Sequence, residues 1–205
     1  RVSIDELYSG WLTIKLPPGG INAFYKEGQH LLERETDDPL TPNQFVLLAD
    51  EANPTHTALG KLSTDTTAVV PLIPTPPEGI WGIRPRNREQ HFTVDALLND
   101  DAKLCTLVGK AGTGKTLLAM AAALQKTVEE RVYHKILVSR PIFPLGRDLG
   151  YLPGDIEEKL NPWMQPIFDN LELLMGLSPG DRKNGRGAHE FIDMGMMAIE
   201  PLTYI

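Results

Sequence analysis

Eight consecutive residues in the second half of the chain have the types and spacing needed to hold phosphate. In order they are Gly109, Lys110, Ala111, Gly112, Thr113, Gly114, Lys115 and Thr116. Glycines let the backbone turn tightly and point its N–H groups toward phosphate oxygens at the start of a helix. The lysine brings a positive charge to the outer phosphates, and the threonine hydroxyl is a ligand for Mg²⁺. The pattern predicts a P-loop that binds ATP or GTP with Mg²⁺, with Lys115 and Thr116 catalytic and Leu117 also in the nucleotide site.

The flanking sequence supplies the elements that a P-loop requires. Lys103–Val108 is a short apolar run that predicts a buried strand ending at the loop, and Lys115–Arg131 predicts a long helix starting from it. A glycine-rich turn that matches the pattern by chance is the alternative, and it would require neither element. The predicted strand and helix therefore favour the phosphate-binding role.

A second predicted helix, Asn87–Asn99, begins upstream of the P-loop and carries Gln90 in its first turn. A glutamine amide offers a paired donor and acceptor, the arrangement by which such side chains read adenine. A solvated helix start, with Glu89 favourable near the positive end of the helix, explains the same residues. Gln90 and Asn87 are therefore candidate nucleotide contacts, with the solvated helix start as the alternative.

A long loop rich in glycine, proline and arginine follows the next predicted strand, Lys135–Ser139. Open α/β sheets bind ligands at the carboxyl ends of their parallel strands, where this loop would lie. Arg140 and Arg147 could contact phosphates of a nucleic acid, and Tyr151 could stack on a base. An ordered surface loop whose aromatic residues fold onto the core fits the sequence equally well.

The pattern of the chain changes at a proline-rich stretch, residues 71–80, which predicts a semi-rigid linker. Residues 1–70 predict a small β-rich module and residues 81–205 an α/β domain. The module's expected strands are Trp11–Leu16, Gln44–Ala49, Ala58–Leu62 and Thr67–Val70, with one helix over Ile21–Glu33 and Asn22 as its N-cap.

In the α/β part, the elements expected after the long loop are a helix, a shorter helix and a strand. They are Asp155–Met175, interrupted at Pro162 and Pro166, then Ala188–Met194 and Met197–Leu202. Alternating strands and helices predict a parallel sheet covered by helices.

Composition bounds the function classes. With 41% hydrophobic and 23% charged residues the chain is typical of a soluble globular protein, and no apolar run is long enough to predict a membrane span. The net charge of −7 argues against a protein that coats nucleic acid by bulk electrostatics. The single cysteine, Cys105, lies in an apolar run and predicts a reduced core thiol, which favours a cytoplasmic protein.

Several separate segments together resemble the PhoH family of ATPases. They are Trp81–Gln90, Val108–Thr116, Ser139–Pro141, Leu149–Gly154, Asp155–Lys159 and Pro201–Tyr204. The resemblance covers about residues 80–205 and implies a partial RecA-like P-loop NTPase core, similar to superfamily 1 helicases. It also implies ATP hydrolysis, action on RNA, assembly into a hexameric ring, and an adenine contact for Gln90. The module before it resembles the segment that joins an N-terminal PIN nuclease domain to the ATPase in PIN–PhoH proteins.

One departure from the family pattern limits the expected activity. The family places an acidic Asp-Glu-Ala-Gln-type segment shortly after a Tyr-Ile pair such as Tyr204-Ile205, where this sequence stops. The resemblance thus implies an ATP-binding module that hydrolyses ATP when complete and acts on RNA together with a PIN nuclease. The alternative is a regulatory or assembly module of a ring that unwinds nothing. A small-molecule kinase would need a lid with clustered arginines, which only the stretch Pro179–Gly187 imitates.

Overall fold

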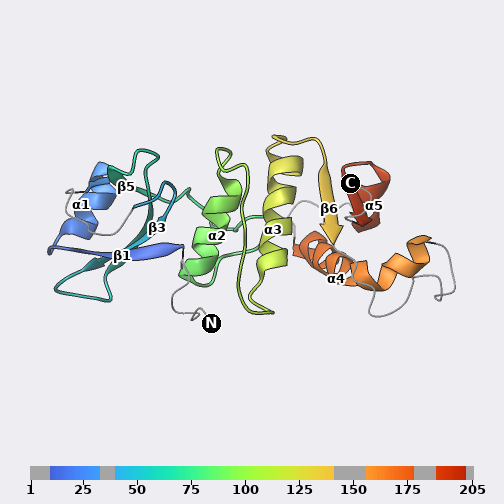
Figure 1. Cartoon of the computed structure of the whole chain (residues 1–205), viewed down its shortest axis with the longest axis horizontal. Coiled ribbons are helices and arrows are strands. Elements are labelled where there is room, and N and C mark those ends of the chain that lie inside the picture. Colours follow the sequence, from blue (N-terminus) through green and yellow to red (C-terminus); the bar gives the residue numbers. More distant parts are fainter. Residues whose placement is uncertain (1–9, 33–39, 141–155, 178–187, 202–205) are drawn as a thin grey trace. The chain divides into compact units, whose positions relative to one another are not determined.

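The computed structural model describes residues 10–32, 40–140, 156–177 and 188–201. The chain divides into two compact units, residues 1–74 and residues 75–205, whose elements are drawn in Figure 1. The division falls inside the proline-rich stretch. The first unit is β-rich, and the second carries the P-loop.

The first unit is built on a five-stranded sheet. Its strands are β1 (Trp11–Leu16), β2 (His30–Leu31), β3 (Phe45–Asp50), β4 (Thr57–Leu62) and β5 (Ala68–Pro71), in the order β1-β3-β4-β5-β2. β1 and β3 are parallel, and the other neighbours are antiparallel. The four strands predicted from alternation are confirmed within one residue at each end. The short strand β2 lies where the sequence predicted a helix.

Glycine decides the limits of the helix in this unit. α1 runs over Gly20–Glu27, after Gly19 with φ of 87°, and ends at Gly28 with φ of 72°. The N–H of Gly28 donates to the Phe24 carbonyl at 2.9 Å, which closes the last turn. The predicted helix to Glu33 with Asn22 as N-cap was therefore wrong at both ends. The helix starts after Gly19, and Gly28 stops it before β2.

The core of the first unit lies between α1 and one face of the sheet. Ile21 and Phe24 of α1 pack with alternating strand residues such as Val46 and Leu48, all at most 1% exposed. Fully burying such a side chain contributes about 1.5–3 kcal/mol each. The alternation of buried and half-buried residues along β3 explains why its pattern was readable from sequence.

The second unit contains the α/β elements. They are α2 (Arg88–Leu98), α3 (Lys115–Leu124), the π-helix η2 (Gln125–Glu129), β6 (Ile136–Arg140), α4 (Ile156–Leu177), α5 (Ala188–Asp193) and β7 (Met197–Pro201). β6 and β7 pair in parallel. The predicted helices before and after the P-loop are confirmed within a few residues. So are the predicted strands Lys135–Ser139 and Met197–Leu202. The unit is a mixed α/β structure consistent with part of a P-loop NTPase fold.

Helix α3 is the central element of this unit. Its buried residues occupy most of its circumference: Leu118, Met120, Ala121, Ala122 and Leu124. A helix that is apolar on nearly all sides needs neighbours on several sides, and α3 contacts both α2 and α4. The P-loop is therefore attached to a helix that packs against two others.

The predicted strand over Lys103–Val108 is not formed. This segment runs as a loop, and the side chains of Leu104 and Val108 are 84% and 96% exposed. In the described part of the chain, β6 pairs with β7, and no strand offers a ladder to this segment. An apolar run becomes a buried strand only when a neighbour supplies hydrogen bonds and cover. Cys105 is half-buried here, and burial raises the pKa of its thiol.

The predicted interruption of the long helix at its prolines was also wrong. α4 continues through Pro162 and Pro166 over 22 residues. Each proline removes one backbone donor, and a helix of this length retains enough bonds and packing to continue. The Asn170 amide donates to the Pro166 carbonyl at 2.5 Å, and Ile167 and Leu171 after it are buried. None of the helices in the described ranges is long and apolar enough to cross a membrane.

A carboxylate closes the turn between β4 and β5. One oxygen of Asp65 accepts from the Ser63 hydroxyl at 2.6 Å, the Thr67 hydroxyl at 2.8 Å and the Thr67 N–H at 3.1 Å. The Ser63 hydroxyl and then the Thr67 groups lower the pKa of Asp65 to about 2, from an ordinary value of 3.8. Because the pKa is lower in the folded state, the charge of Asp65 stabilises the turn above pH 3.8.

We predict that this contribution is lost as the pH falls from 3.8 toward 2. Asp65→Asn keeps an acceptor oxygen but lacks the charge, so the variant should show weaker protection of β4 and β5 amides above that range. It should also show a smaller loss of protection on acidification. Amide hydrogen exchange, expressed as protection factors at pH values on both sides, measures this. Glu51→Gln, at an exposed carboxylate in the same unit, serves as the control. Equal acid sensitivity of wild type and Asp65→Asn would contradict the assignment.

Candidate nucleotide site

Two glycines give the P-loop its backbone shape. Gly112 and Gly114 have φ of 77° and 87°, the left-handed region that other residues rarely adopt. Gly114 is the N-cap of α3, and its carbonyl accepts the first helical bond from the Leu118 N–H at 2.9 Å. The first N–H groups of a helix have no partner within it, so they remain available to an anion. The loop is therefore shaped to hold phosphate.

The Lys115 ammonium lies across the same loop. Its Nζ donates to the carbonyls of Gly109 at 2.9 Å and Lys110 at 2.6 Å, and to the Thr113 hydroxyl at 3.3 Å. The Thr113 hydroxyl in turn donates to the Lys110 carbonyl at 2.9 Å. Lys115 thus supplies its positive charge to oxygens at the mouth of the loop. A phosphate would have to take over some of these contacts.

The remaining predicted residues of the motif lie on the exposed side of the loop. Ala111 and Thr116 are exposed, and Leu117 is half-buried in the first turn of α3. Mg²⁺ in such sites is held by few protein oxygens, with phosphate and water completing its shell. The exposed Thr116 hydroxyl fits that requirement. The described residues contain no group of three or more His, Cys, Asp or Glu side chains that could hold a metal ion.

Gln90 reaches the P-loop from helix α2. Its Nε2 donates to the Thr113 carbonyl at 3.3 Å, and its Oε1 accepts from the Arg86 N–H at 2.8 Å. A Cβ added at Gly114 would lie 3.5 Å from the Gln90 Nε2. The amide is therefore part of the loop's surroundings rather than a solvated side chain at a helix start.

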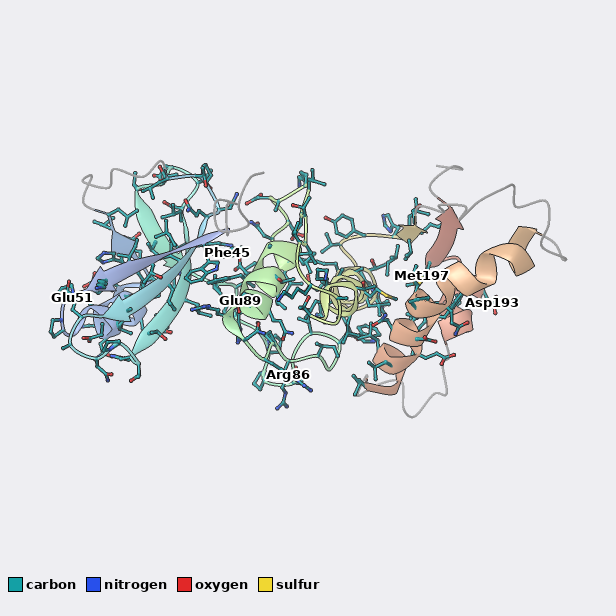
Figure 2. All side chains as sticks on the ribbon, turned by 60° about the horizontal axis from the view of Figure 1, so that its bottom comes forward. Phe45, Glu51, Arg86, Glu89, Asp193 and Met197 are labelled. Carbon is teal, nitrogen blue, oxygen red and sulfur yellow. The ribbon has the colours of Figure 1, made fainter. Side chains whose placement is uncertain are left out.

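Asn87 caps helix α2 and orients Gln90. Its Oδ1 accepts from the Gln90 N–H at 2.9 Å, which satisfies one of the free donors at the helix start. Figure 2 labels Glu89 in this first turn and Arg86 on the chain that leads into it. The hydrogen bond from the Arg88 guanidinium at 2.8 Å lowers the pKa of Glu89, so a negative charge sits at the helix start. The observed role of Asn87 is to cap the helix.

The predicted nucleic-acid residues are only partly described. Arg140 is the last residue of β6, and its side chain lies outside the described part. Arg147 and Tyr151 lie outside it entirely. Arg140 does stand at the carboxyl end of a parallel strand, as the sequence predicted.

Sequence reasoning missed the role of the turn before α2. Trp81 is buried and has φ of 47°, a conformation that costs a bulky residue free energy. Ile80 and Ile83 exchange both backbone hydrogen bonds across the turn, at 3.0 and 2.8 Å. A Cβ at Gly82 would lie 2.9 Å from the Leu177 carbonyl, so the turn packs against the end of α4. In the sequence, the adjacent Trp81 and Gly82 were the signal for this turn.

Comparison with known proteins agrees with this site. The family model described as "PhoH-like protein" matches residues 82–205. A Bacillus subtilis protein called Protein PhoH2 is 43% identical over 204 residues, covering 100% of this chain and 45% of its own length. A Mycolicibacterium smegmatis Protein PhoH2 is 41% identical over 127 residues, which are 62% of this chain and 27% of that protein.

A second Bacillus subtilis protein, called PhoH-like protein, is 33% identical over 123 residues, covering 60% of this chain and 35% of its own length. No solved structure matches the chain. The chain thus spans less than half the length of these relatives. The family model covers the P-loop, α2 and everything that follows them, and on that evidence the chain belongs to the PhoH family.

Proposed function

We propose that the chain binds ATP with Mg²⁺ at the P-loop and hydrolyses it in the complete protein. The observation that carries the proposal is the Lys115 ammonium above a loop with two left-handed glycines at a helix start. In this site the loop N–H groups and Lys115 would hold the phosphates, and Thr116 would hold Mg²⁺. Mg²⁺ would neutralise charge on the transferring phosphoryl group. Lys115 and Thr116 remain the proposed catalytic residues of this chain.

Gln90 would select adenine. Reading adenine requires one donor and one acceptor, and both ends of the Gln90 amide currently bind protein atoms. The Thr113 contact at 3.3 Å is the longer of the two, so the Nε2 group is the easier one to redirect. If Gln90 bound the base, its hydrogen bond to the Thr113 carbonyl of the P-loop would weaken. Binding of the base would thereby affect the phosphate site.

The wider activity is proposed from the family resemblance. The complete protein would act on RNA, join a PIN nuclease to this module, assemble as a hexameric ring and work in the cytoplasm. The loop after β6, with Arg140, Arg147 and Tyr151, is the proposed RNA contact because it begins at the carboxyl end of a parallel strand. An ATP-binding assembly module that unwinds nothing is the competing proposal.

Lys115→Ala tests the ATP site. Loss of the ammonium removes charge-assisted contacts to phosphate, so ATP affinity should fall by roughly one to two orders of magnitude. Titration calorimetry with ATP and Mg²⁺ measures the affinity. Lys135→Ala, at an exposed lysine of the same unit, is the matched control and should bind like wild type. Unchanged affinity in Lys115→Ala would exclude this P-loop as the ATP site.

Gln90→Ala tests base selection. The variant should bind ATP and GTP with more similar affinities, because the paired donor and acceptor are gone. Gln90→Glu keeps the acceptor for the Arg86 N–H and loses the donor to Thr113, so it separates the two ends of the amide. Competition between ATP and GTP for the same site measures the preference. An unaltered preference in both variants would return Gln90 to a purely local role at the helix start.

RNA stimulation distinguishes the two wider proposals. If the module acts on RNA, unstructured single-stranded RNA should raise the steady-state ATP turnover of the full-length protein several-fold. Arg140→Ala should reduce this stimulation. Single-stranded DNA of the same sequence is the control for bulk charge. Turnover that does not respond to RNA would favour the ring-assembly module.

A further inference from the structure

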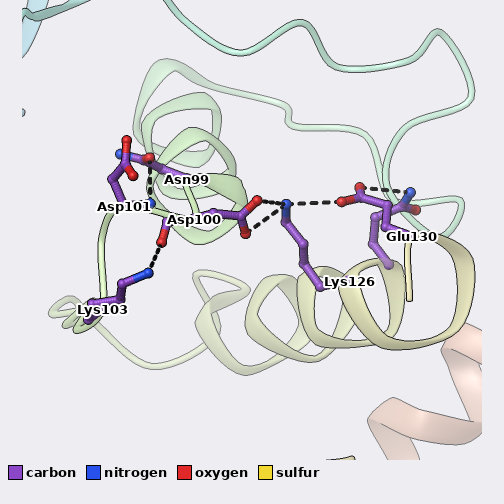
Figure 3. Close-up of polar contacts among 7 residues, drawn as sticks. Asn99, Asp100, Asp101, Lys103, Lys126 and Glu130 are labelled. Carbon is purple, nitrogen blue, oxygen red and sulfur yellow. Dashed lines mark hydrogen bonds and ion pairs between the residues drawn. The ribbon is translucent and has the colours of Figure 1, made fainter. Parts of the chain in front are cut away.

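A buried lysine lies at the far end of the P-loop helix. Lys126, in the π-helix η2 that extends α3, has a side chain only 10% exposed. Its Nζ lies 3.0 Å from both carboxylate oxygens of Asp100 and 2.9 Å from Oε2 of Glu130, as Figure 3 shows. The Gln125 amide donates to the other oxygen of Glu130 at 3.3 Å. Lys126 therefore sits between two carboxylates, one of which comes from a distant part of the chain.

The two carboxylates keep Lys126 charged in spite of its burial. Burial disfavours the charged ammonium and by itself lowers the pKa. The hydrogen bonds and charges of Glu130 and Asp100 outweigh this effect, so the pKa of Lys126 is raised. Most exposed ion pairs contribute little to stability. A buried ammonium is different, because removing its partner leaves an uncompensated charge.

Asp100 belongs to the turn through which the chain enters the P-loop segment. The Asn99 N–H donates to the Asp95 carbonyl at 3.0 Å and ends α2, and the Ala102 N–H donates to the Asn99 carbonyl at 3.1 Å. The Lys103 ammonium donates to the Asp100 carbonyl at 2.5 Å. Asp100 is thus held within its own turn, and its carboxylate fixes that turn to η2.

The backbone of Lys126 fixes a third segment. Its carbonyl accepts from the Val132 N–H at 2.8 Å and from the Tyr133 N–H at 3.4 Å. These residues lead from the helix into β6. π-turns inside helices often occur at functional sites. In this one, the side chain of Lys126 binds two carboxylates, and its carbonyl binds the backbone N–H groups of Val132 and Tyr133. Three segments of the second unit therefore meet at one residue.

Lys126 and Lys115 hold opposite ends of the same stretch of chain. They are 11 positions apart, a spacing that returns to nearly the same helix face after about 16 Å. The chain from α2 runs back alongside α3 before it turns into that helix (Figure 1). Lys126 binds Asp100 where this stretch begins, and Lys115 binds the Gly109 carbonyl where it ends. Between Asp100 and Gly109, this stretch forms no β-sheet hydrogen bonds with any strand that the structure describes.

We propose that Lys126 is a positioning residue for the nucleotide site, which it reaches through Asp100 and the segment leading to Gly109. Its ion pair fixes the start of that segment relative to α3, and so fixes where the P-loop N–H groups point. The inference rests on the ATP site proposed above. The contact joins residues 26 positions apart, so no local sequence pattern indicates it.

The test uses the full-length protein with substitutions on both sides of the ion pair. Lys126→Met keeps an unbranched side chain and removes the charge, whereas Lys126→Arg keeps the charge. Asp100→Asn removes the charge at a half-exposed position, so it should fold even if Lys126→Met does not. Lys135→Met is the matched control. Titration calorimetry gives the affinity for Mg²⁺-ATP, and amide spectra report Gly109, Gly112 and Gly114.

Lys126→Met and Asp100→Asn should each weaken ATP binding about 3- to 30-fold, a range typical of coupling through a structural network. Their P-loop glycine signals should move, although these glycines lie at the opposite end of the helix. Lys126→Arg should restore most of the affinity, and Lys135→Met should match wild type. A merely stabilising role would lower the melting temperature and leave both the affinity and the glycine signals unchanged, which would overturn the proposal.

The spectra need no nucleotide, so they test the positioning role separately from the ATP site. If wild type fails to bind ATP, the proposed ATP site is wrong. In that case glycine signals that still move in Lys126→Met support the structural link from Lys126 to the loop. Unmoved signals overturn it.

Discussion

The left-handed backbone at Gly112 and Gly114 is the constraint on which the nucleotide site depends. With φ of 77° and 87°, these two positions turn the chain tightly where it enters α3. The loop pairs with no strand that the structure describes, so its shape depends on support from neighbouring groups. The Lys115 ammonium, the Gln90 amide and the packing of α3 supply that support from three directions.

The support comes mostly from side chains rather than from a sheet. The stretch before the loop has two almost fully exposed apolar residues, Leu104 and Val108, and no ladder with any strand that the structure describes. Polar contacts at its two ends therefore matter more here than they would beside a paired strand. Gln90, whose amide donates to the Thr113 carbonyl, is one of these contacts.

Local chemistry decided which parts could be predicted from sequence. α2 was predicted within one residue at each end, and β3 was predicted because its apolar and polar positions alternate. The P-loop was predicted because the spacing of its glycines, lysine and threonine is the one that phosphate binding requires. α1 was predicted too long because Gly28 was not read as a stop, and α4 was predicted as broken because proline was given too much weight.

The other differences needed information that no local pattern holds. Lys103–Val108 has the composition of a buried strand, but a strand also needs a partner, which its own residues do not specify. The contact of Gln90 with Thr113 joins residues 23 positions apart, and the ion pair of Lys126 with Asp100 joins residues 26 apart. No local sequence pattern around Lys126 indicates the second of these contacts.

The buried Trp81 turn has a spectroscopic consequence. In the part of the chain that the structure describes, the indole Nε1 of Trp81 is buried and has no hydrogen-bond partner, and the ring is 4% exposed. An indole kept from water emits at shorter wavelength than one in solvent. Because Gly82 of the same turn packs against the end of α4, movement there would admit water to the ring. Trp81 is therefore a built-in optical reporter on the junction between α4 and the segment that leads into α2.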